Sequence, residues 1–557
     1  MATKLVIVGG VAGGATAAAR ARRLDEFAEI VVFERGEYIS FANCGLPYYI
    51  GQVIKKRDKL LVTTAEALKE RYNINVKNFS EVTAIDRQNK KVTLKNIQTG
   101  ETYTETYDKL ILSPGAEPLK PQMEGIDLDT VFSVRNIPDT DRIKAYIDTK
   151  KPESAVIVGG GYIGLEMAEN LVARGVKTTV IEILDQVMAP LDYEMAALVH
   201  DHIREKGVVL ELENSVTAFS KKGHRTVVST GKGHEIECDL VILSIGIKPE
   251  IQLAKESNLE IGERGGIKVD ASMRTSDPDI FAVGDAVEIK DFVTGMPAII
   301  ALAGPANKQG RIAADNAMGR QSRYRSAQGT AIVKIFDMAA ASTGASEKTL
   351  KQNDVSYLTS YTHSDSHAGY YPGAGRLSIK LLFSPDSGML LGAQIVGKEG
   401  VDKRIDVLAT AMRAKMTVFD LEELELAYAP PYSSAKDPVN IAGFVAANIL
   451  KGDLENIYWH ELSSLDSNEC ILIDLRTKKE LEKIGMIDDA IHLPIDDLRQ
   501  NLNELDKTKK YVLCCAVGQR AYIGHRIMVQ NGFQSRNLSG GFITYASVKE
   551  KIKKETT

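Results

Sequence analysis

The 557-residue sequence predicts a multidomain α/β protein. Two stretches, residues 4–33 and 155–181, each combine a short apolar strand, a glycine-rich turn, a helix and a second strand. A third set of strands and helices, after about residue 457, forms an independent α/β pattern at the end of the chain. A chain of this length is expected to fold into roughly four domains.

The composition is that of an ordinary globular protein. Hydrophobic residues make up 44% of the chain, charged residues make up 26%, and the net charge of −5 argues against nucleic acid as the main partner. The sequence has no run of about 18 apolar residues, and glycines interrupt the Ala-rich start where a signal peptide would continue. Five scattered cysteines do not form a disulfide framework and fit a reducing compartment. They are Cys44, Cys238, Cys470, Cys514 and Cys515. We therefore expect a cytoplasmic protein without a membrane partner.

The first glycine-rich turn is typical of a dinucleotide site. It follows the strand Lys4–Val8 and consists of Gly9, Gly10, Val11, Ala12, Gly13 and Gly14. The second strand ends at Glu34, about 20 residues after the glycines, where a carboxylate can accept a hydrogen bond from a ribose hydroxyl. Val11 replaces the second glycine of G-x-G-x-x-G, so a tight strand–helix turn without a ligand remains an alternative.

The second turn has the complete pattern. Gly159, Gly161 and Gly164 supply its glycines, and Tyr162 and Ile163 lie between the last two. A helix is expected to about residue 174, with Gly175 as its C-cap, and the next strand ends at Glu182. A carboxylate there accepts from a free 2′-hydroxyl and repels a 2′-phosphate, so NADH is favoured over NADPH. Two such units predict two bound dinucleotides.

A single cysteine, Cys44, lies shortly after the first unit in the segment Phe41–Tyr49. Gly45-Leu46-Pro47 predicts that a short helix begins beside it, and the helix dipole would favour the thiolate at neutral pH. No second cysteine lies nearby in the sequence. A partner sulfur must therefore come from another molecule or from a distant domain.

Taken in order, these motifs resemble the pyridine nucleotide–disulfide oxidoreductases across residues 1–320. The similarity extends to a strand and turn after each unit, ending at Gly115 and Gly246, and to the strand that ends at Gly284-Asp285. It implies two Rossmann-like domains, an α+β dimerisation domain and a homodimer. The implied ranges are 1–150 and 247–324 for binding FAD, 151–246 for NAD(H), and 325–450 for dimerisation.

The resemblance also assigns the cofactor contacts. For FAD they are Gly9, Gly10, Val11, Ala12, Gly13, Gly14, Glu34, Arg35, Gly115, Asp285 and Ala303, the last in a helix that points at the isoalloxazine ring. For NADH they are Gly159, Gly161, Tyr162, Ile163, Gly164, Glu182 and Gly246. No metal site is implied.

Because only Cys44 is present, the chain is similar to the single-cysteine branch of this family, and the segment around Cys44 is similar to that of the coenzyme A-disulfide reductases. This resemblance implies that Tyr370 and Tyr428 of the partner subunit act as acids at the cysteine, with Tyr371 a neighbouring candidate. The implied coenzyme A contacts are Thr16, Arg20, Arg23, Ser40, Asn43, Arg71, Asn307 and Lys436. From the residues alone, the tyrosines can equally be rim packing, and a solvated helix face is the better explanation of Arg20 and Arg23.

The end of the chain contains a second candidate sulfur site. A strand at residues 511–514 leads into Cys515, and Arg520 follows before a helix. Such a loop forms an anion-binding nest of N–H groups around the sulfur, which would stabilise a thiolate or a persulfide. The stretch resembles a rhodanese-like domain, for which we expect residues 457–557. The four residues between Cys515 and Arg520 favour sulfur transfer over the phosphoryl transfer of related phosphatases, and Cys514 is expected to be a bystander.

The predicted function is that of an FAD-dependent NADH:CoA-persulfide or polysulfide reductase. It would release hydrogen sulfide through a Cys44–CoA mixed disulfide, with sulfane sulfur carried on Cys515. The alternatives are a CoA-disulfide reductase that keeps coenzyme A reduced, an NADH oxidase or peroxidase with a Cys44 sulfenic acid, and a redox sensor. The rhodanese-like tail favours the first, because a disulfide reductase needs no carrier of sulfane sulfur.

Overall fold

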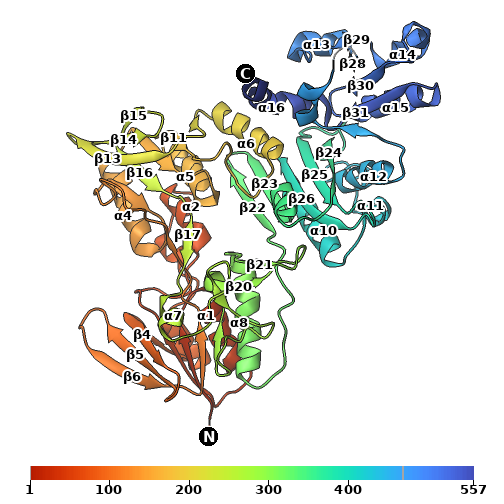
Figure 1. The fold of residues 1–557 in the computed structure, drawn as a ribbon. Coiled ribbons are helices and arrows are strands. Elements are labelled where there is room, and N and C mark those ends of the chain that lie inside the picture. Colours follow the sequence, from red (N-terminus) through yellow and green to blue (C-terminus); the bar gives the residue numbers. More distant parts are fainter. Residues whose placement is uncertain (1, 467–468, 557) are drawn as a thin grey trace. The chain divides into compact units, whose positions relative to one another are not determined.

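The computed structural model describes residues 2–466 and 469–556 (Figure 1). Met1, Ser467, Asn468 and Thr557, which fall inside the predicted domain ranges, lie outside the described residues. The chain forms two compact units. One comprises Met1–Asp185 and Gly207–Gly329, and the other comprises Gln186–Lys206 and Thr330–Thr557.

A five-stranded parallel sheet lies at the centre of the first unit, in the order β19-β7-β1-β2-β3. Its strands are β1 (Lys4–Val8), β2 (Glu29–Phe33), β3 (Asn75–Lys77), β7 (Lys109–Leu112) and β19 (Ile280–Ala282). Helix α1 (Ala12–Arg22) connects β1 to β2 and packs against α8 (Ala303–Ala317) (Figure 1). The apolar run of β1 is buried, as expected for a strand covered on both faces.

A second parallel sheet in this unit repeats the arrangement, in the order β12-β11-β10-β16-β9. Its strands are β9 (Val131–Ser133), β10 (Ser154–Val158), β11 (Lys177–Ile181), β12 (Val209–Glu211) and β16 (Leu240–Leu243). Helix α5 (Tyr162–Ala173) follows the second glycine turn. The C-cap of α5 is Arg174 and not Gly175, because the Arg174 N–H closes a tight last turn on the Leu171 carbonyl; Gly175 follows with a φ of +79°.

Both glycine turns pass close to neighbouring backbone. A Cβ on Gly9 would lie 2.1 Å from the Ser113 carbonyl oxygen, and one on Gly159 would lie 2.4 Å from that of Ser244. Both glycines also have a positive φ, so no other residue fits without strain. Val11 has a φ of −93°, which a branched side chain tolerates. Helix α1 begins directly after it, at Ala12, inside the stretch from Gly9 to Gly14 that was predicted to be the turn.

Small antiparallel elements surround the two sheets. One three-stranded sheet contains β4 (Ser80–Asp86), β5 (Lys91–Asn96) and β6 (Thr102–Thr106), and another contains β13 (Val216–Lys222), β14 (Arg225–Thr230) and β15 (Glu235–Cys238). The strands β8 (Ala116–Pro118) and β17 (Ile247–Pro249) pair with each other. The segment after β2 contains a 3₁₀ turn, η1 (Asn43–Gly45), and the short helix α2 (Leu46–Ile50).

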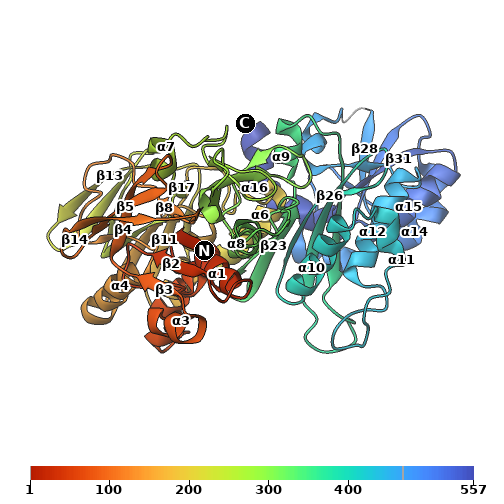
Figure 2. The same ribbon diagram turned by 90° about the horizontal axis from the view of Figure 1, so that it is seen from below.

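The second unit contains an antiparallel sheet in the order β22-β23-β26-β25-β24. Its strands are β22 (Ala331–Ile335), β23 (Met338–Gly344), β24 (Leu358–Asp365), β25 (Arg376–Phe383) and β26 (Leu390–Gly397). The helices α10 (Val401–Arg413), α11 (Val418–Glu423) and α12 (Pro438–Leu450) lie beside it (Figure 2). These strands and helices lie within the range 325–450 that the resemblance implied for dimerisation.

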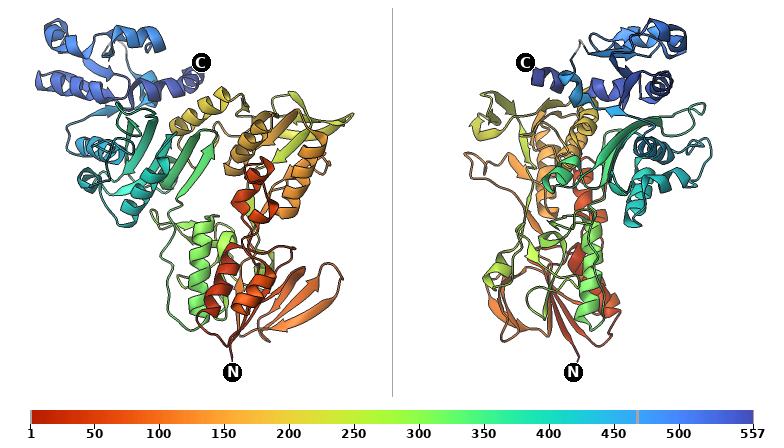
Figure 3. Two further views of the ribbon diagram at one scale, coloured as in Figure 1. Left: turned by 180° about the vertical axis from the view of Figure 1, so that it is seen from behind. Right: turned by 45° about the vertical axis from the view of Figure 1, so that its right-hand side comes forward.

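The tail of the chain forms a parallel sheet in the order β27-β31-β30-β28-β29, shown in blue in Figure 3. The strands are β27 (Asn456–Ile457), β28 (Cys470–Asp474), β29 (Ile491–His492), β30 (Lys510–Cys514) and β31 (Gln534–Leu538). The helices are α13 (Lys478–Ile484), α14 (Ile495–Asn501), α15 (Gln519–Gln530) and α16 (Gly541–Thr556). Separate buried clusters cover the two faces of this sheet.

The tail is fastened to the antiparallel sheet of the second unit. The Tyr458 hydroxyl donates to the Thr359 carbonyl at 2.9 Å, and His363 Nε2 lies 2.8 Å from Thr544 Oγ1. Both Thr359 and His363 belong to β24. The tail therefore meets one edge strand of that sheet at two points.

A helix from the middle of the chain completes this packing. Helix α6 (Tyr193–Glu205), which belongs to the segment 186–206, lies beside α16 (Figure 2). A small buried cluster joins them, made of Ala197, Trp459 and Val548. Lys551 Nζ also lies 3.8 Å from the centre of the Tyr193 ring.

Candidate functional site

Each glycine turn holds the carboxylate that ends the second strand of its unit. The Gly10 N–H donates to Glu34 Oε2 at 2.9 Å, and the Gly160 N–H donates to Glu182 Oε2 at 2.7 Å. The two units thus have the same local geometry. Each carboxylate faces the turn on which a dinucleotide would lie.

Three of the glycines predicted to contact the dinucleotides, Gly115, Gly161 and Gly246, have open space where a side chain would lie. A Cβ added to Gly115 or Gly161 would meet no atom within 4 Å, and one on Gly246 would meet only the end of Leu119, at 3.4 Å. Arg35, by contrast, is held by the carboxylates of Glu117 and Glu250. The guanidinium of Arg35, which was predicted to contact FAD, is therefore already paired with two carboxylates of the protein.

Asp285 lies in the turn η3 (Gly284–Ala286), directly after β19. Its side chain is partly buried, and burial raises the pKa of the carboxyl group. Within residues 2–466 and 469–556, no group donates a hydrogen bond to it. A partly buried carboxylate without a donor fits a ligand hydroxyl, so the residues present fit FAD. Ala303 is the first residue of α8, as the resemblance implied.

Cys44 lies in η1 immediately before α2, so the predicted short helix beside the cysteine is present. The thiol is exposed, but the expectation of an acidic thiol is wrong in this structure. Partial burial raises the pKa of the Cys44 thiol, and the carboxylates of Glu166 and Asp285 raise it further. A single turn of helix does not outweigh these effects.

Glu166 is a residue of this site that the sequence reasoning missed. Its carboxylate accepts a hydrogen bond from the Tyr48 hydroxyl at 3.2 Å. Burial raises the pKa of Glu166 to about 7, and the nearby Glu169 adds to the effect. The signal in the sequence was an acid two residues after Gly164, on a helix that begins at a dinucleotide turn.

The residues predicted to contact coenzyme A are partly brought together in the first unit. Thr16 Oγ1 donates to Asn307 Oδ1 at 2.5 Å, which joins α1 to α8. Arg20 is paired with Asp315 at 2.6 Å. Arg23, Asn43 and Arg71 are exposed, and Ser40 is half-buried with a φ of +44°. Lys436 is exposed and belongs to the second unit.

The second unit brings together Tyr370 and Tyr428. Both side chains are exposed and belong to loops, and their hydroxyl groups are hydrogen-bonded to each other. Tyr371 is also exposed, but its ring contacts His367. The geometry therefore pairs Tyr370, and not Tyr371, with Tyr428.

Cys515 lies in a closed loop at the end of β30. The Gly518 N–H points at Cys515 Sγ, at 3.2 Å, and Gly518 precedes α15 with a φ of +93°. The first turn of α16 supports the loop, because the Phe542 N–H donates to the Cys515 carbonyl at 2.7 Å. A Cβ on Gly541 would lie 2.4 Å from that oxygen, so only glycine allows this approach. The thiol is buried within the nest.

Cys514 and Cys515 pack on opposite faces of the tail sheet. Both are free thiols. Burial raises the pKa of Cys514 well above its ordinary value, which makes it unreactive. This arrangement agrees with the expectation that Cys514 is a bystander.

Arg520 interacts with the Cys515 thiol and is also held by a carboxylate. Its two terminal nitrogens donate to Glu480 at 2.8 and 2.6 Å. Glu480 also accepts from Thr477 as the third residue of a capping box at the start of α13. The sequence pattern contained Glu480 but gave no indication that it would reach the loop.

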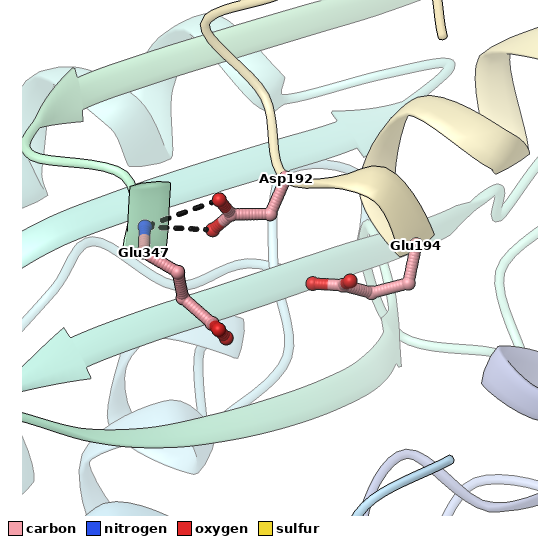
Figure 4. A group of neighbouring side chains, drawn as sticks. All are labelled: Asp192, Glu194 and Glu347. Carbon is pink, nitrogen blue, oxygen red and sulfur yellow. Dashed lines mark hydrogen bonds between the residues drawn. The ribbon is translucent and has the colours of Figure 1, made fainter. Parts of the chain in front are cut away.

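Three carboxylates form a buried cluster in the second unit, drawn in Figure 4: Asp192, Glu194 and Glu347. Asp192 accepts from the Glu347 N–H at 3.1 Å. The Lys380 ammonium lies among all three, at 2.7, 2.5 and 2.7 Å, and is completely buried. Burial alone would raise the pKa of Glu347, but Lys380 outweighs it and lowers that pKa to about 2. The cluster thus has its own cation and ties α6 to the antiparallel sheet.

Family comparisons match the chain in three consecutive parts. The pyridine nucleotide-disulphide oxidoreductase family matches residues 3–310, its dimerisation domain matches residues 330–438, and the rhodanese-like domain matches residues 459–547. A coenzyme A disulfide reductase of Staphylococcus haemolyticus is 39% identical over 447 residues, which is 80% of this chain and 100% of that protein.

Two solved structures extend the similarity to the tail. The reduced CoADR-RHD of Bacillus anthracis is 50% identical, covers 99% of both chains and has a TM-score of 0.96. An NAD-dependent persulfide reductase from A. fulgidus is 38% identical, covers 97% of this chain and 100% of its own, and has a TM-score of 0.91. Among the described residues, no helix has the length and apolar character needed to span a membrane.

Proposed function

Because the chain belongs to the pyridine nucleotide-disulphide oxidoreductase family and ends in a rhodanese-like domain, we propose that it reduces CoA persulfide or polysulfide with NADH and releases hydrogen sulfide. The observation that carries this proposal is the presence of two separate sulfur sites in one chain, Cys44 and the Cys515 loop. Solved structures with the same two modules, one of them named a persulfide reductase, support it.

The dinucleotide sites supply the electrons in this proposal. The first glycine turn, Asp285 and the start of α8 would hold FAD, which when bound passes two electrons from a nicotinamide to a disulfide. We propose NADH for the second turn, because the Glu182 carboxylate, which accepts from the Gly160 N–H, would repel a 2′-phosphate.

Cys44 is the proposed nucleophile. Its thiolate attacks the CoA-bound sulfur of the persulfide CoA–S–S–H, the S–S bond breaks, and the outer sulfur leaves as hydrosulfide. The product is a Cys44–S–S–CoA mixed disulfide. Two electrons then break this bond and regenerate the Cys44 thiolate and the CoA thiolate.

A proton must reach the departing CoA thiolate. We assign this role to Tyr370 of the partner subunit and Tyr428 of the partner subunit, in a homodimer with shared sites. Tyr370 carries its proton at neutral pH, and the hydrogen bond between the two hydroxyls raises the pKa of that phenol further. The coenzyme A itself would be held by Thr16, Arg20, Arg23, Ser40, Asn43, Arg71 and Asn307, with Lys436 from the dimerisation segment.

Cys515 is the proposed carrier of sulfane sulfur. The nest around its sulfur would stabilise a persulfide anion, which can pass the outer sulfur to coenzyme A or to Cys44. The second candidate function is that of a CoA-disulfide reductase, which the name of the S. haemolyticus relative favours. That function needs Cys44 but makes no use of Cys515.

NADH consumption with CoA persulfide, polysulfide and CoA disulfide separates these functions. Cys44→Ser should abolish turnover of all three substrates, and Cys515→Ser should impair only turnover that depends on a sulfur donor. Cys470→Ser, in β28 of the same sheet, is the matched control and should behave as the wild type. Faster turnover of CoA disulfide, with no effect of Cys515→Ser, would favour the second candidate.

A further inference from the structure

The positive charge of Arg520 at the end of the Cys515 loop is paired with the negative charge of Glu480. Arg520 is the one basic side chain of the segment 515–520, and both of its terminal nitrogens are taken by Glu480. An arginine normally binds a sulfonate or phosphate by offering these two nitrogens as a fork. In this chain that fork already holds a carboxylate.

Glu480 is fixed in this position from two sides. Its carboxylate accepts from the Thr477 N–H at 2.9 Å and from the Thr477 hydroxyl at 2.8 Å, in addition to Arg520. Arg520 and Thr477 hold the pKa of Glu480 down, to about 2, so the group is ionised at neutral pH. The Glu480 carboxylate therefore places a negative charge beside the Cys515 loop at neutral pH.

Two apolar side chains share helix faces with the members of this ion pair. Ile484 is four residues after Glu480 on α13, and Ile523 is three residues after Arg520 on α15, so each shares a helix face with one member of the pair. Ile484 is 48% exposed and Ile523 is 42% exposed. By the same spacing the exposed Lys483, three residues after Glu480, also lies on that face of α13. The surface outside the loop thus presents two isoleucines and one lysine beside an arginine that is already paired.

We propose that Glu480 determines the donor of the Cys515 loop, selecting persulfide sulfur carried on an organic thiol and rejecting small dianionic sulfonates such as thiosulfate. This inference rests on the proposed role of Cys515. With a persulfide R–S–S–H, the Cys515 thiolate attacks the outer sulfur, the S–S bond breaks, R–S⁻ leaves, and Cys515–S–S–H forms. With thiosulfate, the same attack would expel sulfite, whose two negative charges would face Glu480 instead of a free arginine.

Sulfur transfer to cyanide, which yields thiocyanate, tests the inference on the full-length FAD-loaded enzyme without involving NADH. Glu480→Gln keeps the capping geometry, since glutamine also serves at this position, but removes the charge. We expect kcat/KM for thiosulfate to rise about tenfold, and that for glutathione persulfide to change less than about threefold, as removal of one nearby charge would produce. Glu482→Gln, at an exposed position of the same helix, is the control and should change neither value.

A merely supporting role for Glu480 would lower both activities together, and that result, or an unchanged ratio, would overturn the inference while the proposed function stands. Cys515→Ser should abolish transfer from both donors. If it abolishes neither, the proposed role of Cys515 fails and this inference falls with it.

Discussion

The hydroxyl groups of Tyr370 and Tyr428 lie 3.0 Å apart, although the two residues are separated by 58 positions in the sequence. Both rings are exposed, 76% for Tyr370 and 48% for Tyr428, so neither is held in place by a hydrophobic core. A pair of hydrogen-bonded phenols at the surface is ready to pass a proton to a group that arrives from outside.

We predict that Tyr370→Phe and Tyr428→Phe each lower kcat for the CoA substrate about 10²–10⁴-fold, the range for loss of a general acid. Reduction of the bound flavin by NADH, measured in a single turnover, should be unaffected. Tyr432→Phe is the control, because it removes a hydroxyl from another exposed tyrosine, four residues after Tyr428. This variant should retain activity. Equal losses for all three variants would mean that these tyrosines only support the loops.

Cys44 should react with iodoacetamide at a rate that still rises above pH 9. The thiolate is the reactive form, and a raised pKa moves its formation to higher pH. Glu166→Gln removes a neighbouring negative charge and should shift the midpoint of this profile to lower pH. Cys44→Ser gives the background from the other thiols. A plateau already reached by pH 7 would restore the acidic thiol that the sequence predicted.

Glu182→Gln should reduce the preference for NADH. The variant keeps an acceptor for the Gly160 N–H, but it no longer repels a 2′-phosphate. The ratio of kcat/KM for NADH to that for NADPH is expected to fall about tenfold, which corresponds to loss of one close charge repulsion. A faster reaction of the wild type with NADPH than with NADH would contradict the role given to Glu182.

Lys380→Met should destabilise the second unit by about 3–5 kcal/mol, because it leaves three buried carboxylates without their cation. Lys351→Met is the matched control. Lys351 also pairs with Glu347, at 3.2 Å, but it is 65% exposed, so its loss should cost less than about 1 kcal/mol. Denaturant unfolding followed by tryptophan fluorescence reports on this unit, since Trp459 is the one tryptophan of the chain. Equal effects of the two substitutions would show that burial of Lys380 does not matter.

Much of the fold could be predicted because its signals are local. The short apolar runs before Gly9 and Gly159 are strands to within one residue, and the family comparisons confirm the predicted α/β class with its dimerisation and rhodanese-like parts. Helix starts were less accurate, since α1 begins inside the glycine turn and not after it.

The electrostatics of the site could not be predicted because they depend on residues far apart in the sequence. The carboxylate of Glu166 reaches the environment of Cys44 from helix α5. Burial, Glu166 and Asp285 together raise the pKa of the Cys44 thiol, against the expected effect of the helix dipole. Glu480 meets Arg520 across 40 positions. A periodicity or motif within one stretch of sequence does not indicate which distant side chains will come into contact.

The small cluster of Ala197, Trp459 and Val548 limits where the chain can be truncated without exposing apolar surface. A truncated reductase that ends near residue 450 would expose the α6 surface that α16 now covers, together with the free edge of β24. Such a truncation would leave an apolar patch on α6 and an uncovered edge of β24, which stays paired with β25 on its other side, and both features promote self-association. The tail therefore covers apolar surface of the rest of the chain. A truncated protein without the tail would need polar substitutions on α6 to remain soluble.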